Sequence, residues 1–204
     1  MRYEAVIFDL DGTLYDKSRL PLYVVLSDLG HLRCLKAERT TRKELMGKDF
    51  GTEDEFYSLF FAAAAAKAGV TPERFRQWYF GRYMPDMARI LSDHYRLYPW
   101  VEEVFASLRS SGVKTAVFSD YSAVPDKLSA LGFSSTWVDL IADAPSFGGL
   151  KPSEASFRRL AKAMGVTPSQ CLMVGDRQDT DGEGALAAGM SFSLYKGEGM
   201  PSLD

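Results

Sequence analysis

Two aspartates one residue apart, Asp9 and Asp11, come directly after the short apolar run Ala5–Phe8. Side chains alternate along an extended strand, so both carboxylates would point the same way if the strand continued, and Gly12 lets the chain turn there. Burying paired carboxylates is costly unless a cation or a proton compensates them. Carboxylates can act as nucleophiles and as proton carriers, so the pair is a candidate catalytic site. The alternative is that one aspartate caps a helix and the other is solvated.

Polar residues also follow the later apolar runs. Ser119 and Asp120 end the run Lys114–Phe118, and Gly175-Asp176 ends the run Cys171–Val174. The remaining candidates are Lys151, at the start of a helical pattern, and two aspartates in the loop after Asp176, namely Asp179 and Asp181. In a parallel sheet all of these points would meet at one edge, where open α/β sheets bind their ligands.

The elements that would hold these residues alternate in type. Five apolar runs read as strands: Ala5–Phe8, Lys114–Phe118, Trp137–Ile141, Cys171–Val174 and Ser191–Tyr195. Beyond residue 98 they alternate with four helical patterns: Pro99–Ser110, Pro125–Leu131, Ser153–Met164 and Asp181–Ala188. This alternation predicts an α/β fold, a Rossmann-like doubly wound parallel sheet with right-handed crossovers.

Residues 15–97 break that alternation. They hold no convincing strand but four helical patterns: Pro21–Lys36, Arg42–Met46, Glu53–Ala68 and Pro72–Arg96. We therefore expect an all-α cap domain over 15–97, inserted into a core domain made of 1–14 and 98–204. Counting ionisable side chains gives the cap a net charge of +3 and the core −6, which would suit an anionic substrate held with a metal.

Within the cap, helical spacing places the aromatic residues in the interior rather than around a substrate. They are Phe56, Phe60, Phe61, Phe75, Trp78, Tyr79 and Tyr83. Tyr15 and Asp16 begin the hinge and should lie near the pocket. The basic cluster Arg39, Arg42 and Lys43 is expected to be a solvated face, with substrate contact as the less favoured alternative.

The composition of the chain limits the classes of partner that it is expected to bind. The net charge of −3 argues against nucleic acid or an anionic membrane surface, and no apolar run approaches the eighteen or so residues of a membrane span. The chain enters a strand at once, so no signal peptide is expected, and we predict a cytoplasmic protein, a monomer or homodimer. Cys34 and Cys171 form no motif, and Cys171 should be buried; His31 and His94 are too few for a histidine metal site.

Taken together, these motifs resemble the haloacid dehalogenase-like hydrolase superfamily, in its branch with a helical cap after the first strand, which includes phosphoglycolate phosphatases and beta-phosphoglucomutase-like enzymes. The matching residues, in the family's order, are Asp9-Leu10-Asp11-Gly12-Thr13-Leu14, Ser119, Lys151, and Gly175-Asp176 with Asp181. The similarity spans essentially the whole chain and is weakest in the cap.

The resemblance implies a Mg²⁺-dependent phosphatase of small phosphate monoesters. In it, Asp9 would attack phosphorus to form an aspartyl-phosphate, and Asp11 would serve as general acid and base. Lys151 would hold the nucleophile and the phosphoryl group, which Ser119 and the backbone of Asp120 would also bind. The metal would be held by Asp9, Asp176 and the carbonyl of Asp11, with Asp181 holding its water shell.

Each residue also has a structural interpretation. Ser119 could merely end a strand, Lys151 could be a surface lysine, and Asp181 fits a helix N-cap. Asp179 has no family counterpart and is expected to be a solvated loop residue. Two positions depart from the pattern: Asp120 stands where many relatives carry Asn, and Trp100, which is expected to pack at the hinge, stands where Gly is common.

Other functions stay open at this point. A sugar phosphomutase would use the same site but return the phosphoryl group to its substrate. A dehalogenase of the same fold is disfavoured by Asp11 and the metal carboxylates. A catalytically idle protein that uses the cap as an interaction surface is the alternative from a different class. The natural substrate is not determined by the sequence.

Overall fold

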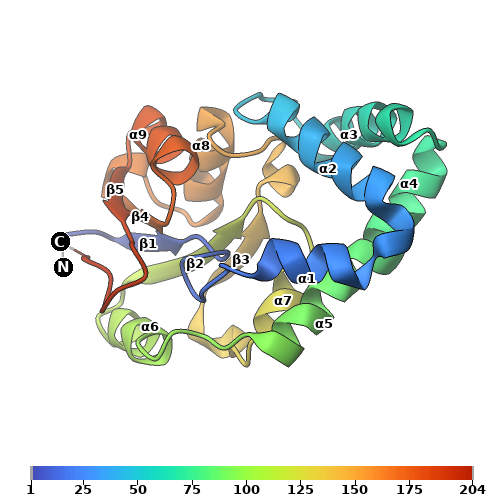
Figure 1. Ribbon diagram of the computed structural model, residues 1–204. Helices are drawn as coiled ribbons and strands as arrows, with labels where there is room; N and C mark the ends of the chain where they lie inside the picture. Colours follow the sequence, from blue (N-terminus) through green and yellow to red (C-terminus); the bar gives the residue numbers. More distant parts are fainter. Residues whose placement is uncertain (1, 204) are drawn as a thin grey trace.

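The computed structural model describes residues 2–203, in which a single parallel sheet has the order β3-β2-β1-β4-β5 (Figure 1). Its strands are β1 (Ala5–Phe8), β2 (Lys114–Ser119), β3 (Leu140–Asp143), β4 (Cys171–Gly175) and β5 (Ser191–Leu194). Every residue of β1, the central strand, is buried, as its uninterrupted apolar sequence predicts for a sheet covered on both faces. The expected doubly wound α/β fold is confirmed.

Helices cover both faces of this sheet. The helices α6 (Val101–Ser110) and α7 (Val124–Ala130) pack on one face, which includes Val6 and Phe8 of β1. The helices α8 (Glu154–Ala163) and α9 (Glu183–Ala188) pack on the other, with Ala5 and Ile7. Alternate residues of one strand therefore serve two separate apolar clusters. Because helices pack on both faces, the sheet holds the residues at the carboxyl ends of its strands in defined positions.

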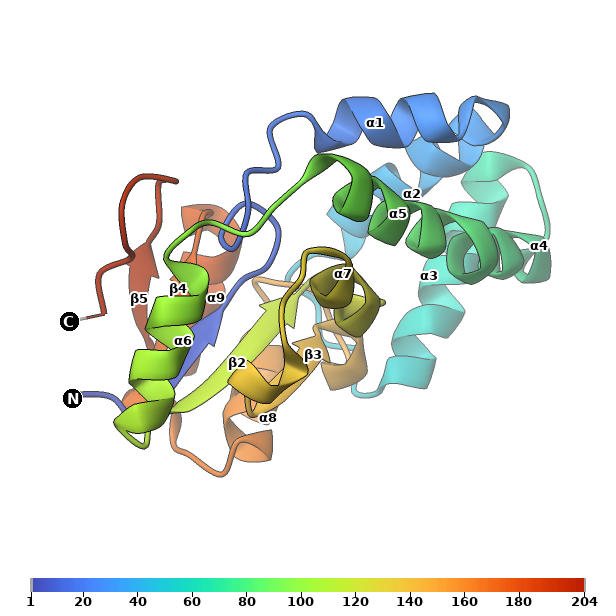
Figure 2. The ribbon, with the colours of Figure 1, turned by 90° about the horizontal axis from the view of Figure 1, so that it is seen from below.

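The other helices form a group beyond the carboxyl ends of the strands (Figures 1 and 2). They are α1 (Leu20–Ser27), α2 (Leu32–Leu45), α3 (Glu53–Ala68), α4 (Pro72–Trp78) and α5 (Met84–His94), with a π-helical turn, Tyr79–Tyr83, joining the last two. The segments entering and leaving the group lie side by side, and the Tyr98 amide donates to the Leu14 carbonyl (2.8 Å). All seven aromatic residues expected in the interior of this group are buried.

Two expected elements differ from the structure. The pattern Pro21–Lys36 is not one helix: α1 ends at Ser27, Leu29–His31 is a 3₁₀ turn, and α2 then runs on through the pattern expected at Arg42–Met46. The break is at Asp28, whose buried carboxylate accepts hydrogen bonds from Trp78 Nε1 (2.7 Å) and Arg82 Nε (2.8 Å). Helical periodicity cannot anticipate such contacts, because both partners lie about fifty residues away.

The third strand is also displaced from the expected run Trp137–Ile141. It begins at Leu140, because Ser135–Trp137 forms a 3₁₀ turn in which the Ser134 hydroxyl accepts from the Thr136 amide (3.3 Å). Trp100 packs against Phe8 of β1 and also stacks on Tyr98, at the segment expected to be the hinge, and its Nε1 donates to the Tyr195 hydroxyl (2.9 Å). Cys171 is buried as expected. Within residues 2–203, the helices are too short or too polar to span a bilayer.

Candidate active site

The two aspartates after β1 are both buried, with 7% of Asp9 and 9% of Asp11 exposed, and they face different partners. The Asp9 carboxylate accepts from Lys151 Nζ (2.6 Å) and from the Thr13 hydroxyl (3.2 Å). The Asp11 carboxylate accepts from the Tyr15 hydroxyl (2.5 Å) and from the Ser119 hydroxyl (3.2 Å). The structure thus brings the pair to one place but gives each carboxylate its own surroundings. This hydrogen bond places Tyr15 beside Asp11 at the candidate site.

Lys151 is buried between two carboxylates. Its Nζ lies 2.6 Å from Asp9 Oδ1 and 2.7 Å from Asp181 Oδ1, and only 2% of the residue is exposed. Burial alone would lower the pKa of Lys151, but Asp181, Asp9 and Asp120 outweigh it and raise that pKa above its ordinary value. The side chain is therefore a fixed ammonium, not the surface lysine of the alternative interpretation.

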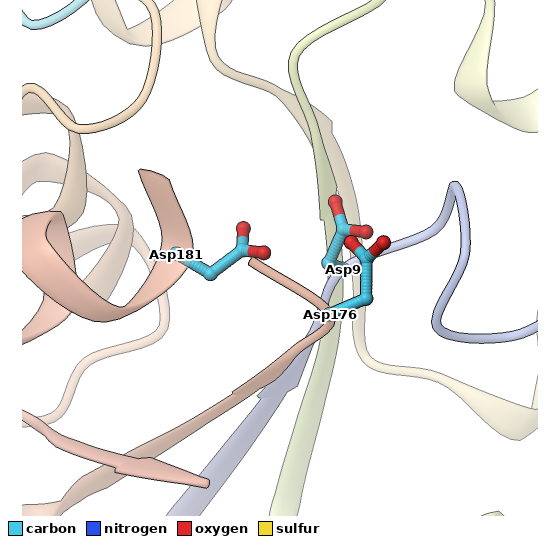
Figure 3. Close-up of side chains that lie close together, drawn as sticks. All are labelled: Asp9, Asp176 and Asp181. Carbon is cyan, nitrogen blue, oxygen red and sulfur yellow. The ribbon is translucent and has the colours of Figure 1, made fainter. Parts of the chain in front are cut away.

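Three carboxylates gather at this edge of the sheet: Asp9 after β1, Asp176 after β4 and Asp181 in the π-helical turn Gln178–Gly182 (Figure 3). One oxygen from each lies within 4.8 Å of the others. Burial, with Asp181 and Asp11 nearby, raises the pKa of Asp9 to about 6, although Lys151 opposes this. Burial likewise raises the pKa values of Asp176 and Asp181. Clustered oxygen donors that resist ionisation together suit a hard divalent cation such as Mg²⁺.

Lys17 belongs to the site but was not among the residues expected there. Its Nζ lies 2.6 Å from Asp176 Oδ2 and donates to the backbone carbonyl of Asp11 (2.6 Å). These are two of the three atoms expected to hold a metal. Gly12, at φ +94°, makes the approach possible, since a Cβ there would lie 2.4 Å from Asp176 Oδ2 and 2.8 Å from Lys17 Nζ. In the sequence, only the position of Lys17, eight residues after Asp9 and shortly before α1, indicates that it lies near the site.

A third cation, Lys127 of α7, lies near the other aspartate. Its Nζ lies 3.9 Å from Asp11 Oδ2. Burial raises the pKa of Asp11, but Lys127, the hydrogen bond from Tyr15, Lys17 and Ser119 together bring it below its ordinary value. The pKa values of the two aspartates are therefore shifted in opposite directions. Environments that separate two carboxylates in this way are typical of sites where they have different roles.

Ser119 and Asp120 lie at the end of β2, as expected. Ser119 is buried and its hydroxyl accepts from the Tyr121 amide (3.2 Å) while donating to Asp11. The Asp120 carboxylate accepts from the backbone amide of Lys151 (2.8 Å), so this departure from the family pattern ties two of the expected motifs together. Burial raises the pKa of Asp120.

Two expectations about individual residues were wrong. Asp181 is not the N-cap of α9, which is Gly182; its carboxylate instead bonds Lys151 and accepts from the Arg177 amide (3.2 Å). Arg42 is not solvated: it is buried, and Nη1 donates to the carbonyl of Asp120 (2.7 Å). The i,i+4 spacing in the sequence predicts that Arg42 pairs with Glu38, but it does not predict that Arg42 is buried.

Two other predictions about charged residues are confirmed. Arg39 and Lys43 are exposed, in agreement with a solvated face. Asp179 is also exposed, and its carboxylate pairs with Arg177 of the same loop (2.6 Å).

Known proteins resemble the chain over most of its length. It is 28% identical to a ribulose-1,5-bisphosphate 5-phosphatase of Halopiger xanaduensis, over 94% of this chain and 84% of that protein. It is 29% identical to the chloroplastic protein SUPPRESSOR OF QUENCHING 1 of Arabidopsis thaliana, where the match covers 86% of this chain but only 16% of that protein.

The fold has solved counterparts. The structure of a predicted phosphoglycolate phosphatase from Haemophilus somnus superposes with a TM-score of 0.62 at 24% identity, over 94% of this chain and 84% of that one. A sequence model described as haloacid dehalogenase-like hydrolase matches residues 3–189, which contain all of the carboxylates and lysines described above. The chain belongs to the haloacid dehalogenase-like hydrolase family.

Proposed function

We propose that this protein is a Mg²⁺-dependent phosphatase that hydrolyses small phosphate monoesters through an aspartyl-phosphate on Asp9. The observation that carries the proposal is the buried ammonium of Lys151, which holds Asp9 and Asp181 beside Asp176. Membership of a hydrolase family and a relative named as a sugar bisphosphate phosphatase agree with it.

In the first half of the reaction, a carboxylate oxygen of Asp9 attacks phosphorus and the bond from phosphorus to the ester oxygen breaks. Two like charges must approach, and Lys151 offsets part of that repulsion from its position on Asp9 Oδ1. Mg²⁺, held by Asp9, Asp176 and the carbonyl of Asp11, would supply further charge neutralisation and orient the phosphoryl oxygens. The Ser119 hydroxyl and the Asp120 backbone would bind those oxygens.

Asp11 moves the protons. It gives one to the departing ester oxygen and later takes one from the water that attacks the aspartyl-phosphate, which releases phosphate and restores Asp9. By itself, Asp11 favours the carboxylate, since its pKa is lowered. A phosphate dianion bound beside it would raise that pKa, so Asp11 becomes protonated as the substrate binds. Tyr15 and Ser119 fix the orientation of its two oxygens.

We further propose that residues 15–97 form a cap domain that opens and closes over a core made of 1–14 and 98–204. The adjacent segments at Leu14 and Tyr98 would be the hinge. Closure would exclude water before attack, and opening would let the product leave.

The test is release of free phosphate from para-nitrophenyl phosphate with Mg²⁺. Asp9→Asn should lower kcat by about 10³-fold or more, because the amide is not a nucleophile. Asp179→Asn is the matched control, since Asp179 is exposed and pairs with Arg177 of its own loop; its activity should stay at the wild-type level. Chelating the metal should abolish turnover of the wild type. Turnover that survives either Asp9→Asn or chelation would contradict the mechanism.

A further inference from the structure

We propose that Lys127 binds an anionic group on the leaving-group half of the substrate, and that the protein therefore prefers phosphate esters carrying a small oxyanion, such as a carboxylate, close to the ester oxygen. This inference rests on the proposed phosphatase function. It begins from one unusual side chain. Lys127 is fully buried in α7, and its Nζ has no hydrogen-bond partner among residues 2–203.

An ammonium has three donors, and burying one with none of them satisfied is unfavourable. The nearest compensation is incomplete: Asp11 Oδ2 lies 3.9 Å from Nζ, beyond hydrogen-bond distance, and the centroid of the Tyr121 ring lies 4.7 Å away. The other buried lysine of the site, Lys151, has two carboxylate partners at 2.7 Å or less. Lys127 thus retains bonding capacity that Lys151 has used.

The neighbouring acceptors are already engaged by other donors. The charged groups that act on Lys127 are Asp11, Arg42, Glu38 and Asp143. Asp11 accepts from Tyr15 and Ser119, and Glu38 accepts from Arg42 Nε (2.8 Å). Asp143 accepts from the Ser146 amide (2.8 Å). Each of these three carboxylates already has another donor, so the proposal assigns the acceptor for Lys127 to a bound molecule.

The position of Lys127 indicates which part of the substrate that acceptor belongs to. Lys151 serves Asp9, the carboxylate that meets phosphorus, whereas Lys127 stands beside Asp11, the carboxylate that meets the ester oxygen. Atoms near Lys127 would then be those a few bonds beyond the ester oxygen.

An oxyanion there is favoured over a neutral group. Arg42 adds positive charge nearby, with its guanidinium carbon 4.1 Å from the centroid of the same Tyr121 ring. Lys151, beside Asp9, would then face the phosphoryl half of the substrate, and Lys127, beside Asp11, would face the leaving-group half.

The experiment compares 2-phosphoglycolate with 2-hydroxyethyl phosphate, which has the same carbon skeleton but a neutral hydroxyl in place of the carboxylate. Wild-type kcat/KM, measured with Mg²⁺, should be at least tenfold higher for 2-phosphoglycolate. Lys127→Met changes the surroundings of Asp11 and should slow both esters, but 2-phosphoglycolate should lose at least tenfold more in kcat/KM than the neutral ester, with the extra loss appearing in KM. Lys162→Met, at an exposed lysine of α8, is the control and should keep the preference. Equal losses for the two esters, or no wild-type preference, would overturn the inference.

A binding measurement separates this inference from the proposed function. Calorimetry on Asp9→Asn needs no turnover, and adding Lys127→Met should weaken binding of 2-phosphoglycolate at least tenfold but hardly change that of the neutral ester. If wild-type hydrolysis fails and this difference remains, the proposed function is wrong and the anion site stands. Thermal unfolding tests for a merely structural role: Lys127→Met should unfold no lower than the wild type, and a drop of several degrees would count against a ligand-binding lysine. Lys127→Gln repeats both comparisons if the methionine variant does not fold.

Discussion

At the scale of single residues, the site consists of two carboxylates with separate counter-charges. Asp9 has Lys151, and burial still raises its pKa to about 6; Asp11 has Lys127, Tyr15 and Ser119, and its pKa is lowered. The two carboxylates, only two positions apart, therefore differ in the cations and hydrogen-bond donors that surround them. This difference is a physical basis for one of them attacking phosphorus and the other carrying protons.

Lys17 bears on metal binding. Its ammonium contacts Asp176 Oδ2 and the Asp11 carbonyl, both at 2.6 Å, so a cation held by those atoms must displace it. Lys17→Met should therefore tighten Mg²⁺ binding, by roughly fivefold if the displaced contacts contribute about 1 kcal/mol. Titration calorimetry of the purified protein with Mg²⁺ measures this directly.

The control for that titration is Lys196→Met. Lys196 is exposed just after β5, at the same edge of the sheet, so it tests whether removing any nearby positive charge has the same effect. Affinity in Lys196→Met should change less than twofold. Unchanged or weaker Mg²⁺ binding in Lys17→Met would show that the lysine does not compete with the metal.

At the scale of elements, close packing behind β4 sets the positions of Asp176 and Asp181. A Cβ at Gly175 would lie 2.4 Å from Asp181 Oδ2, so the strand can end beside this carboxylate only with glycine. In α9, a Cβ at Gly184 would lie 2.3 Å from Cε2 of the buried Phe157 ring in α8 and 2.9 Å from Cα of Pro152, the neighbour of Lys151. Two glycines thus allow three segments of the site to meet.

Gly184→Ala tests this packing. Since neither a buried ring nor backbone can move freely, we expect the free energy of unfolding to fall by about 1–3 kcal/mol. Gly81→Ala is the matched control, because a Cβ at Gly81 would meet nothing within 4 Å and the helical backbone favours alanine. Chemical denaturation should show Gly81→Ala equal to or slightly above the wild type, and an equally stable Gly184→Ala would refute the packing argument.

At the scale of the whole molecule, Arg42 connects the helical group to the sheet. From α2 it donates to Glu38 on the same helix, to the Tyr79 hydroxyl (3.0 Å) and to the Asp120 carbonyl after β2 (2.7 Å). Tyr57 of α3 adds a hydrogen bond to Ser122. These contacts reach the loop that carries Ser119 and Asp120. Movement of the proposed cap would therefore shift this loop at the proposed phosphate site.

Arg42→Met should have two separable effects. It leaves Glu38, only 2% exposed, without its cation, which should destabilise the fold by about 3–5 kcal/mol. It also removes the contact to Asp120. The double variant Glu38→Gln/Arg42→Met should recover most of the stability in denaturation experiments while hydrogen exchange in residues 120–124 stays faster than in the wild type. Wild-type exchange in the double variant would mean that Arg42 does not link the two parts.

The sequence by itself determined the fold class and which candidate residues come together at the sheet edge. Apolar runs such as Ala5–Phe8 and Cys171–Val174 need burial on both faces, and parallel strands must end at a common edge, so Asp9, Asp11, Ser119, Lys151 and Asp176 had to converge. Element boundaries followed local signals where capping was local, as at Thr52 and Glu55 before α3. The boundary prediction was wrong at Asp28, where α1 ends and the carboxylate accepts hydrogen bonds from two distant residues.

Only the tertiary structure decided how the charges are partnered. Lys17, Arg42 and Lys127 belong to sequence patterns that are also typical of solvated surface, and nothing local distinguishes them from Arg39 or Lys43. Each acquires its role from groups brought near by folding: Lys17 from Asp176, Arg42 from Asp120, and Lys127 from Asp11. Periodicity records which side of an element is apolar, whereas the partner of a buried charge depends on the three-dimensional approach of segments far apart in the chain.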